Sequence, residues 1–206
     1  QVVYYFAAGL QLGAPHRPMA FSVPTGNFGD VFAGYVAARM GLPVAQLIVA
    51  TNVNDILYRA LSQGDYSAGM VTPTATPSMD IQVSSNFERL LFDVGGRDGA
   101  AMAAQMHGFE ASRAMQLTNA QREGAAALFT SARVDQNDTA QAMRWAYEQC
   151  GEIIDPHTAV GLHAARACGL DPAVPVVTLA TAHPAKFPEA VERATGIRPA
   201  LPARVG

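Results

Sequence analysis

The chain has 206 residues, of which half are hydrophobic and 15% are charged, so it can bury a sizeable core and is not disordered or fibrous. Its formal net charge of −3 and its scattered arginines provide no basic face, which argues against nucleic acid as a partner. No apolar run approaches the roughly 18 residues that a membrane span requires, so we expect no membrane partner.

The first predicted element is an apolar helix over residues 2–10, with no capping residue before it. Because the sequence opens at Gln1 inside an element, we expect these residues to be the C-terminal part of a longer polypeptide. Residues 19–23 follow as a short buried strand, residues 28–40 as a helix closed by Gly41, and residues 47–50 as a second strand. A third helix, capped by Asn54 or Asp55, is expected to end at Gly64. This order predicts βαβ architecture.

The next stretch, residues 71–78, is rich in Thr and Pro and is predicted as a loop, after which Asp80 caps a helix over residues 81–92. Residues 97–150 have helical spacing, and we predict a helical insertion or appendage there. The α/β pattern resumes with a helix over residues 155–167 and a strand over residues 176–180. We therefore predict one α/β lobe from residues 1–96 and 151–206, built on an open, mostly parallel sheet.

The two cysteines, Cys150 and Cys168, lie far apart in predicted helices and form no paired motif. We expect buried free thiols and a cytoplasmic location. His157 and His163 are six residues apart, which is not the spacing that places two imidazoles on one metal, so no metal site is expected.

A glycine-bracketed turn, Gly26 to Gly29, joins the first strand to the following helix. Backbone N–H groups at such a turn are unpaired and the helix dipole adds positive charge, so the turn suits a phosphate. It matches neither GxxxxGK[ST] nor GxGxxG, which weakens a nucleotide-binding reading. The pattern alone is equally consistent with a tight turn that binds nothing, and Asp30 with an acid that merely stabilises the helix start.

A polar turn, Thr181 to Phe187, follows the last predicted strand, at the sheet edge where ligands bind in open α/β proteins. Its hydroxyl, imidazole and ammonium groups could hold an anion or a heterocycle nitrogen. Lys186 is the only lysine, so any Schiff base between this chain and pyridoxal 5′-phosphate (PLP) would have to use it. A solvated surface lysine is the simpler reading.

Five segments resemble the C-terminal part of threonine synthases, in order and at plausible spacing: VPTGNFGD, LIVATNVND, PSMDIQVSSNFERLLF, DPHTAVG and VTLATAHPAKF. The resemblance implies the three-layer fold of the tryptophan synthase β subunit and a PLP-dependent lyase of threonine biosynthesis. Such an enzyme converts O-phospho-L-homoserine and water to L-threonine and phosphate.

The resemblance also implies roles for individual residues. Thr181 would meet the pyridine nitrogen of PLP, and His183 and Lys186 would assist binding of the substrate or its phosphate. The Schiff-base lysine of the family lies in a Ser/Ala-Phe-Lys-Asp segment of an N-terminal domain, which this sequence does not contain. We therefore expect the catalytic lysine outside this chain and no activity from the chain alone. The implied cup for the cofactor phosphate consists of Gly26, Asn27, Phe28, Gly29 and Asp30.

Two other functions stay open at this point. The chain could be a non-catalytic binding module for a phosphorylated small molecule. It could also be another PLP lyase or dehydratase of the same fold, although dehydratases usually carry a longer glycine tract in place of GNFGD.

Overall fold

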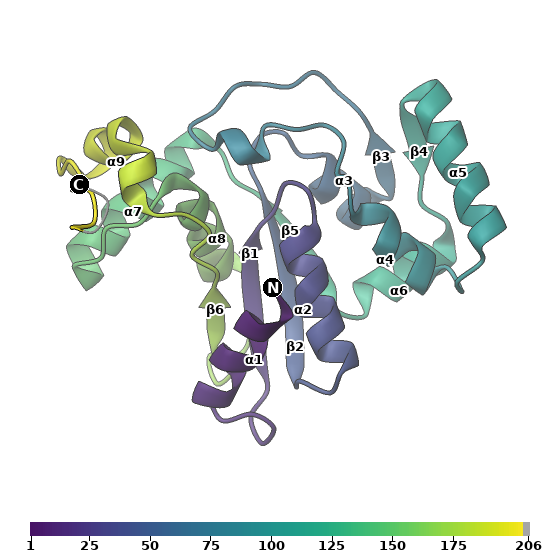
Figure 1. The fold of residues 1–206 in the computed structure, drawn as a ribbon, viewed down its shortest axis with the longest axis horizontal. Helices are drawn as coiled ribbons and strands as arrows, with labels where there is room; N and C mark the ends of the chain where they lie inside the picture. Colours follow the sequence, from purple (N-terminus) through teal and green to yellow (C-terminus); the bar gives the residue numbers. More distant parts are fainter. Residues whose placement is uncertain (204–206) are drawn as a thin grey trace.

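The computed structural model describes residues 1–203, which form an α/β fold around a four-stranded parallel sheet with strand order β5-β2-β1-β6 (Figure 1). A separate antiparallel pair joins β3 to β4. The strands are β1 (Met19–Pro24), β2 (Val44–Thr51), β3 (Asp65–Ser67), β4 (Ala114–Gln116), β5 (Phe129–Arg133) and β6 (Val176–Thr178). The α-helices are α1 (Val2–Gln11), α2 (Gly29–Arg39), α3 (Ile56–Gln63), α4 (Phe87–Val94), α5 (Gly99–Ser112), α6 (Asn119–Ala126), α7 (Gln136–Cys150), α8 (Pro156–Ala167) and α9 (Pro188–Thr195). The 3-10 helices are η1 (Pro77–Met79) and η2 (Pro184–Lys186).

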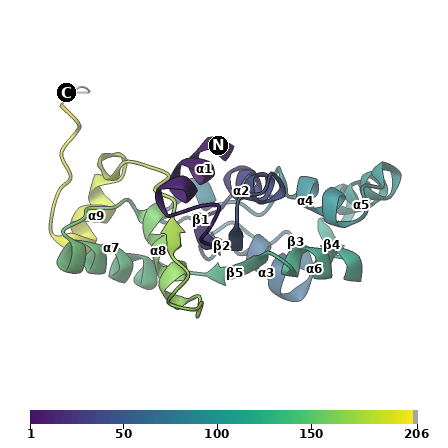
Figure 2. The ribbon, with the colours of Figure 1, turned by 90° about the horizontal axis from the view of Figure 1, so that it is seen from below.

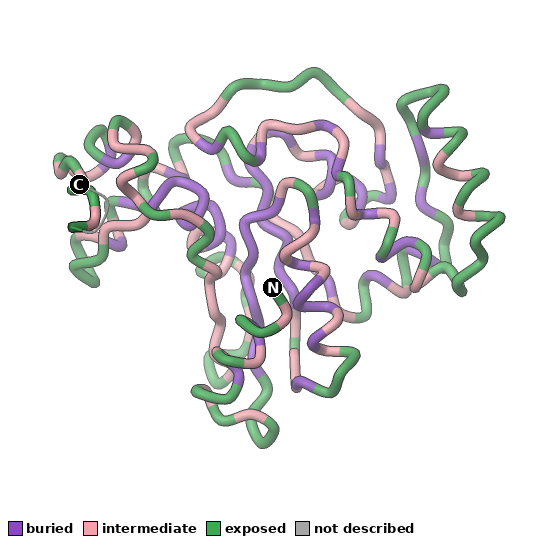
Figure 3. The backbone as a smooth tube through the Cα atoms, viewed as in Figure 1, coloured by how far each residue is buried: buried purple, intermediate pink, exposed green. Residues whose placement is uncertain are grey.

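The central strands are buried on both faces, as parallel sheets are when helices cover them. Alternate residues of β1 and β2 face opposite ways: Phe21 and Leu47 join the core beneath α1 and α2, whereas Ile48 packs with Val160 of α8. Figure 2 shows α1 and α2 on one side of the sheet, and Figure 3 shows burial continuing along β1. The predicted α/β class with a mostly parallel sheet is confirmed.

Segment 97–150 is not purely helical, which corrects the predicted helical insertion. It contains β4 and β5, and β5 is an edge strand of the main sheet, paired with β2 from Leu47 to Thr51. The prediction missed β5 because Phe129 is followed by small and polar residues, which give no alternation of apolar side chains. The segment is therefore part of the sheet that it was expected to interrupt.

The helix predicted over residues 81–92 begins later, at Phe87, and Asp80 does not cap it. The Asp80 carboxylate instead accepts hydrogen bonds from Asn52 and Asn54, at 2.8 and 3.1 Å, and from the backbone and side chain of Thr74. These bonds tie the segment before η1 to the end of β2. A capping acid and a loop-anchoring acid have the same local sequence signature, so only the tertiary contacts distinguish them.

The expectation that both cysteines are buried is also wrong. Cys150 is exposed at the end of α7 and Cys168 is half-buried, although both are free thiols. Within residues 1–203, none of the helices combines the length and the apolar character needed to cross a membrane.

Candidate active site

The turn after β1 presents a row of unpaired backbone donors. Thr25 still pairs with the sheet, its N–H donating to the Ala50 carbonyl at 2.8 Å. In the described part of the chain, the backbone N–H groups of residues 26–31 have no hydrogen-bond acceptor. Because these groups stand at the start of α2, the helix dipole adds to their positive potential. The arrangement is chemically suited to a phosphate group.

Phe28 holds the turn in shape despite an unfavourable backbone conformation. Its φ of 64° lies in the left-handed region, which costs a non-glycine residue about 1–2 kcal/mol. Its ring is 1% exposed and packs at centroid distances of 5.1 Å from Phe87 and 5.7 Å from Phe129. Burial of such a ring contributes about 1.5–3 kcal/mol, which is enough to offset the strain.

The two glycines of the turn are required to different degrees. A Cβ on Gly26 would lie 2.6 Å from the Ser78 carbonyl oxygen, so the close approach of η1 excludes any side chain there. A Cβ on Gly29 would meet the nearest atom, Nδ2 of Asn86, at an ordinary 3.5 Å. Space therefore demands glycine at position 26 but not at position 29.

Asp30 is fixed from beneath by Tyr5, a fully buried residue of α1. The Tyr5 hydroxyl donates to the Asp30 carbonyl oxygen at 2.8 Å and to its Oδ1 at 3.2 Å. Burial raises the pKa of the Asp30 carboxyl above its ordinary value, and the hydrogen bond from Tyr5 opposes that shift. Burial and the neighbouring Asp30 raise the pKa of the Tyr5 hydroxyl, so it remains a donor.

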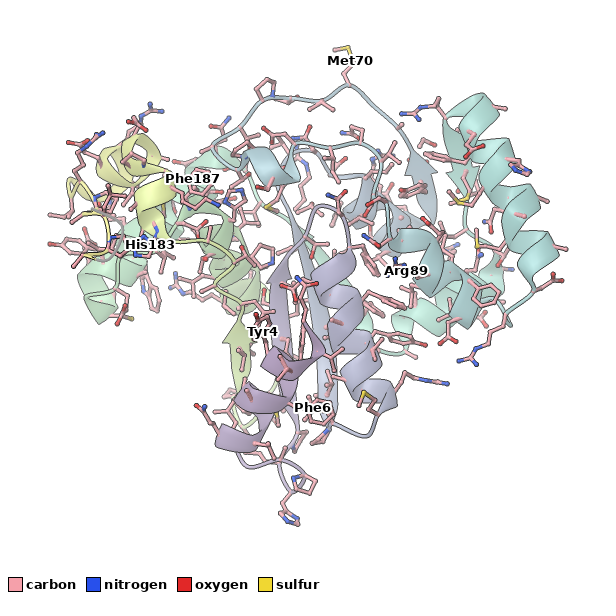
Figure 4. The ribbon with its side chains drawn as sticks, in the orientation of Figure 1. Tyr4, Phe6, Met70, Arg89, His183 and Phe187 are labelled. Atoms are coloured by element: carbon pink, nitrogen blue, oxygen red, sulfur yellow. The ribbon has the colours of Figure 1, made fainter. Side chains whose placement is uncertain are left out.

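A cavity of about 450 Å³ brings Asp30 together with Thr181. Residues 178–181 line it from the end of β6, and Gln1 and Tyr4 line it from α1. Tyr4 is visible beside β6 in Figure 4. Two of the positions predicted from separate parts of the sequence thus share one site, at the carboxyl edge of adjacent parallel strands.

His183 and Lys186 do not line this cavity. His183 is exposed, and its Nδ1 accepts a hydrogen bond from the Ala185 N–H at 3.1 Å, so it caps η2. Lys186 lines a second cleft of about 420 Å³, between the segment from Pro73 to Pro77 and the start of α9. In Figure 4, His183 and Phe187 lie well to one side of Tyr4.

Sequence reasoning missed the segment that braces the turn, residues 84–86. Ser84 Oγ donates to the Gly26 carbonyl and Asn86 Nδ2 to the Asn27 carbonyl, both at 2.8 Å. Ser85 Oγ donates to Asn27 Oδ1 at 3.3 Å. The available signal was a run of short hydrogen-bonding side chains directly before an amphipathic helix.

A second group that was not predicted lies at the start of α8. His157 is 4% exposed, its Nδ1 lies 2.9 Å from Asp155 Oδ1, and its ring packs on Phe187 with centroids 4.7 Å apart. Within residues 1–203, its buried Nε2 has no hydrogen-bond partner.

Comparison with known proteins resolves the family. A family model described as "Threonine synthase, C-terminal" matches residues 158–206. The chain is 56% identical to threonine synthase from Pseudomonas aeruginosa, over 100% of this chain and 44% of that protein. Over its whole length, the chain corresponds to a C-terminal portion of threonine synthase. Threonine synthase from Saccharomyces cerevisiae is 40% identical over 94% of this chain, which spans 41% of the yeast protein.

Solved threonine synthase structures share the fold closely. PLP-bound threonine synthase from Brucella melitensis superposes with a TM-score of 0.96 at 50% identity, over 99% of this chain and 44% of that one. Yeast threonine synthase gives 0.88 at 39% identity, over 94% and 42%. A PLP-dependent aspartate racemase, at 11% identity and a TM-score of 0.53, shares the fold alone. The chain thus spans less than half the length of the threonine synthases it matches.

Proposed function

We propose that this chain supplies the PLP-binding lobe of a threonine synthase, which converts O-phospho-L-homoserine and water to L-threonine and phosphate. The observation that carries the proposal is the row of backbone N–H groups at residues 26–31, which lack an acceptor within residues 1–203. Asp30, in this row, lines a cavity together with Thr181. The identity to threonine synthases over the whole chain supports the same function.

The site fits the cofactor in two respects. The N–H groups of Gly26, Asn27, Phe28, Gly29 and Asp30 would hold the phosphate, and the Thr181 hydroxyl would meet the pyridine nitrogen. A hydroxyl partner leaves that nitrogen less fully protonated than an aspartate would. When bound, PLP supplies an electron sink for the elimination of phosphate and the addition of water. This chain contributes binding and orientation to that chemistry.

We also propose that Lys186, with His183 nearby, assists binding of the substrate phosphate. The cleft that Lys186 lines also holds Arg193, and within residues 1–203 neither cation forms an ion pair. Glu189 in the same cleft pairs instead with Arg198. The cleft therefore has two uncompensated cations that attract an anion.

The catalytic groups of the enzyme would lie in a part of the protein outside this chain. The matched threonine synthases are more than twice as long as this chain, and we assign the Schiff-base lysine and the general acid and base to a domain equivalent to their other part. Two free cysteines support a cytoplasmic location.

The test is to incubate the full-length protein that carries these residues with PLP and O-phospho-L-homoserine, and to measure threonine and inorganic phosphate. We expect both products in equal amounts, and slower turnover for Thr181→Val, which removes the hydroxyl at nearly constant volume. A full-length protein that binds PLP but forms no threonine would overturn the proposal and favour a non-catalytic binding module.

A further inference from the structure

Ser84 and Asn86 contact backbone carbonyl oxygens, not N–H groups, of the turn at residues 26–29, which we call the phosphate turn. The Ser84 hydroxyl donates a hydrogen bond to the Gly26 carbonyl, and the Asn86 side-chain amide donates one to the Asn27 carbonyl. In a planar trans peptide the C=O and the N–H of the same unit point in opposite directions. Fixing these two carbonyls therefore fixes the direction of the Asn27 and Phe28 N–H groups.

The fixed direction leaves both donors available. The N–H groups of Asn27 and Phe28 have no acceptor within the described residues, while the carbonyls of the same two peptide units are both occupied. A turn with free carbonyls could rotate its peptide units and present oxygen to an anion. The side chains of Ser84 and Asn86 oppose that rotation.

The bracing segment is itself anchored in the core. Ser84 is 1% exposed and Tyr66 of β3 is 2% exposed. The Tyr66 hydroxyl accepts from the Ser84 N–H at 2.8 Å and donates to the Ser84 carbonyl at 3.3 Å. The next residue after Asn86 is Phe87, whose ring packs on Phe28. The segment is thus held at both ends by buried aromatic side chains.

We propose that Ser84 and Asn86 are positioning residues of the anion site, which orient the Asn27 and Phe28 N–H groups toward the cofactor phosphate. The inference rests on the proposed function and adds the source of the turn's geometry. Preorganised donors bind more tightly because their ordering is completed before the ligand arrives. Removal of either brace should therefore weaken recognition of phosphate specifically.

The experiment compares dissociation constants for PLP and for pyridoxal, which lacks the phosphate, in the full-length protein and its Ser84→Ala and Asn86→Ala variants. Each variant loses one hydrogen bond, for which we expect about tenfold weaker binding of PLP. Binding of pyridoxal should be unchanged. Ser84→Thr keeps the hydroxyl and should restore PLP binding, and Ser62→Ala, a distant exposed serine bonded within its own helix, serves as the control.

The outcomes separate the inference from the proposed function. Equal weakening of PLP and pyridoxal would show a general structural role and would overturn the inference, as would unchanged PLP binding in Asn86→Ala. Asn86 is only half-buried, so its variant should keep the fold even if Ser84→Ala does not. A wild-type protein that binds neither PLP nor inorganic phosphate would contradict the proposed function as well.

Discussion

Asp155 combines complete burial with a full set of hydrogen bonds. Its carboxylate accepts from the backbone N–H groups of His157 and Thr158, from His157 Nδ1 and from the Thr158 hydroxyl. Burial opposes ionisation, but the hydrogen bonds from His157 and Thr158 outweigh it and hold the pKa of Asp155 below its ordinary value. One side chain therefore both caps α8 and fixes the imidazole that packs on Phe187.

We expect Asp155→Asn to lower the free energy of unfolding by about 2–4 kcal/mol at pH 7, because an amide cannot accept all of these bonds. Since the folded-state pKa is depressed, the stabilisation by Asp155 is present above its unfolded pKa and is lost as pH falls through the folded pKa. The difference between wild type and variant should therefore shrink below about pH 4. Denaturant unfolding at several pH values measures it.

Asp98→Asn is the matched control for this substitution. Asp98 caps α5 from an exposed position and accepts from Ala100 and Ala101, both at 3.0 Å. Asparagine caps helices about as well as aspartate, so stability should change by less than about 0.5 kcal/mol. An equal loss in both variants would refute the special role of the buried carboxylate.

At the scale of elements, predictability followed the strength of local signals. The strand Met19–Pro24 was predicted because its residues form a continuous apolar run. The helix Pro156–Ala167 was predicted because an aspartate cap followed by proline is a helix start signal that can be read from neighbouring residues. The strands β3 and β4 have three residues each, too short for periodicity to show, and β5 lacks alternating apolar residues. Helix α9 also went unpredicted.

The residues of the candidate site also differ in whether a local sequence signal reports them. Asp30 was found because it lies at the start of the helix that follows the glycine-bracketed turn, and Thr181 because it lies in the polar turn after the last strand of the parallel sheet. Ser84 and Asn86 act on carbonyl groups nearly 60 residues earlier in the sequence, and no local pattern reports such a contact. Likewise, only the folded chain shows that Lys186 lines a different cleft from Thr181, although the two residues are five positions apart.

The close contact between the phosphate turn and η1 leads to a prediction about Gly26. In Gly26→Ala the new Cβ would overlap the Ser78 carbonyl, and we expect a loss of about 1–3 kcal/mol of stability with weaker PLP binding. Gly108→Ala is the matched substitution, because nothing lies within 4 Å of its Cβ in the middle of α5. It should add about 0.5–1 kcal/mol. Thermal unfolding of both variants checks the opposite signs.

At the scale of the whole molecule, the sheet interleaves distant parts of the chain. Its inner strands, β1 and β2, come from the first 51 residues, and its outer strands, β5 and β6, begin at Phe129 and Val176. Residues 68–76 connect the two halves in an arch that is prominent in Figure 1, and Met70 within it is 91% exposed. The residues before this arch and the residues after it are therefore joined by an exposed connection, yet they share one sheet and one core.

We expect the full-length protein to remain folded after cleavage of the chain at Met70. Met70 itself is exposed, and each half needs the strands of the other to complete the sheet. Limited proteolysis followed by size-exclusion chromatography under native conditions should recover both pieces in one peak. Separation of the pieces without denaturant would contradict the interleaved sheet.

The strand order also determines how long each strand waits for its partner while the ribosome synthesises the chain. The inner strands are translated first, yet the partner of β2 begins 78 residues after Thr51. At roughly 5–20 residues per second, that edge of β2 stays unpaired for about 4–16 s. An open apolar strand edge invites pairing with other chains. Nascent copies of this protein are thus most exposed to aggregation, and to chaperone capture, between the completion of β2 and the arrival of β5.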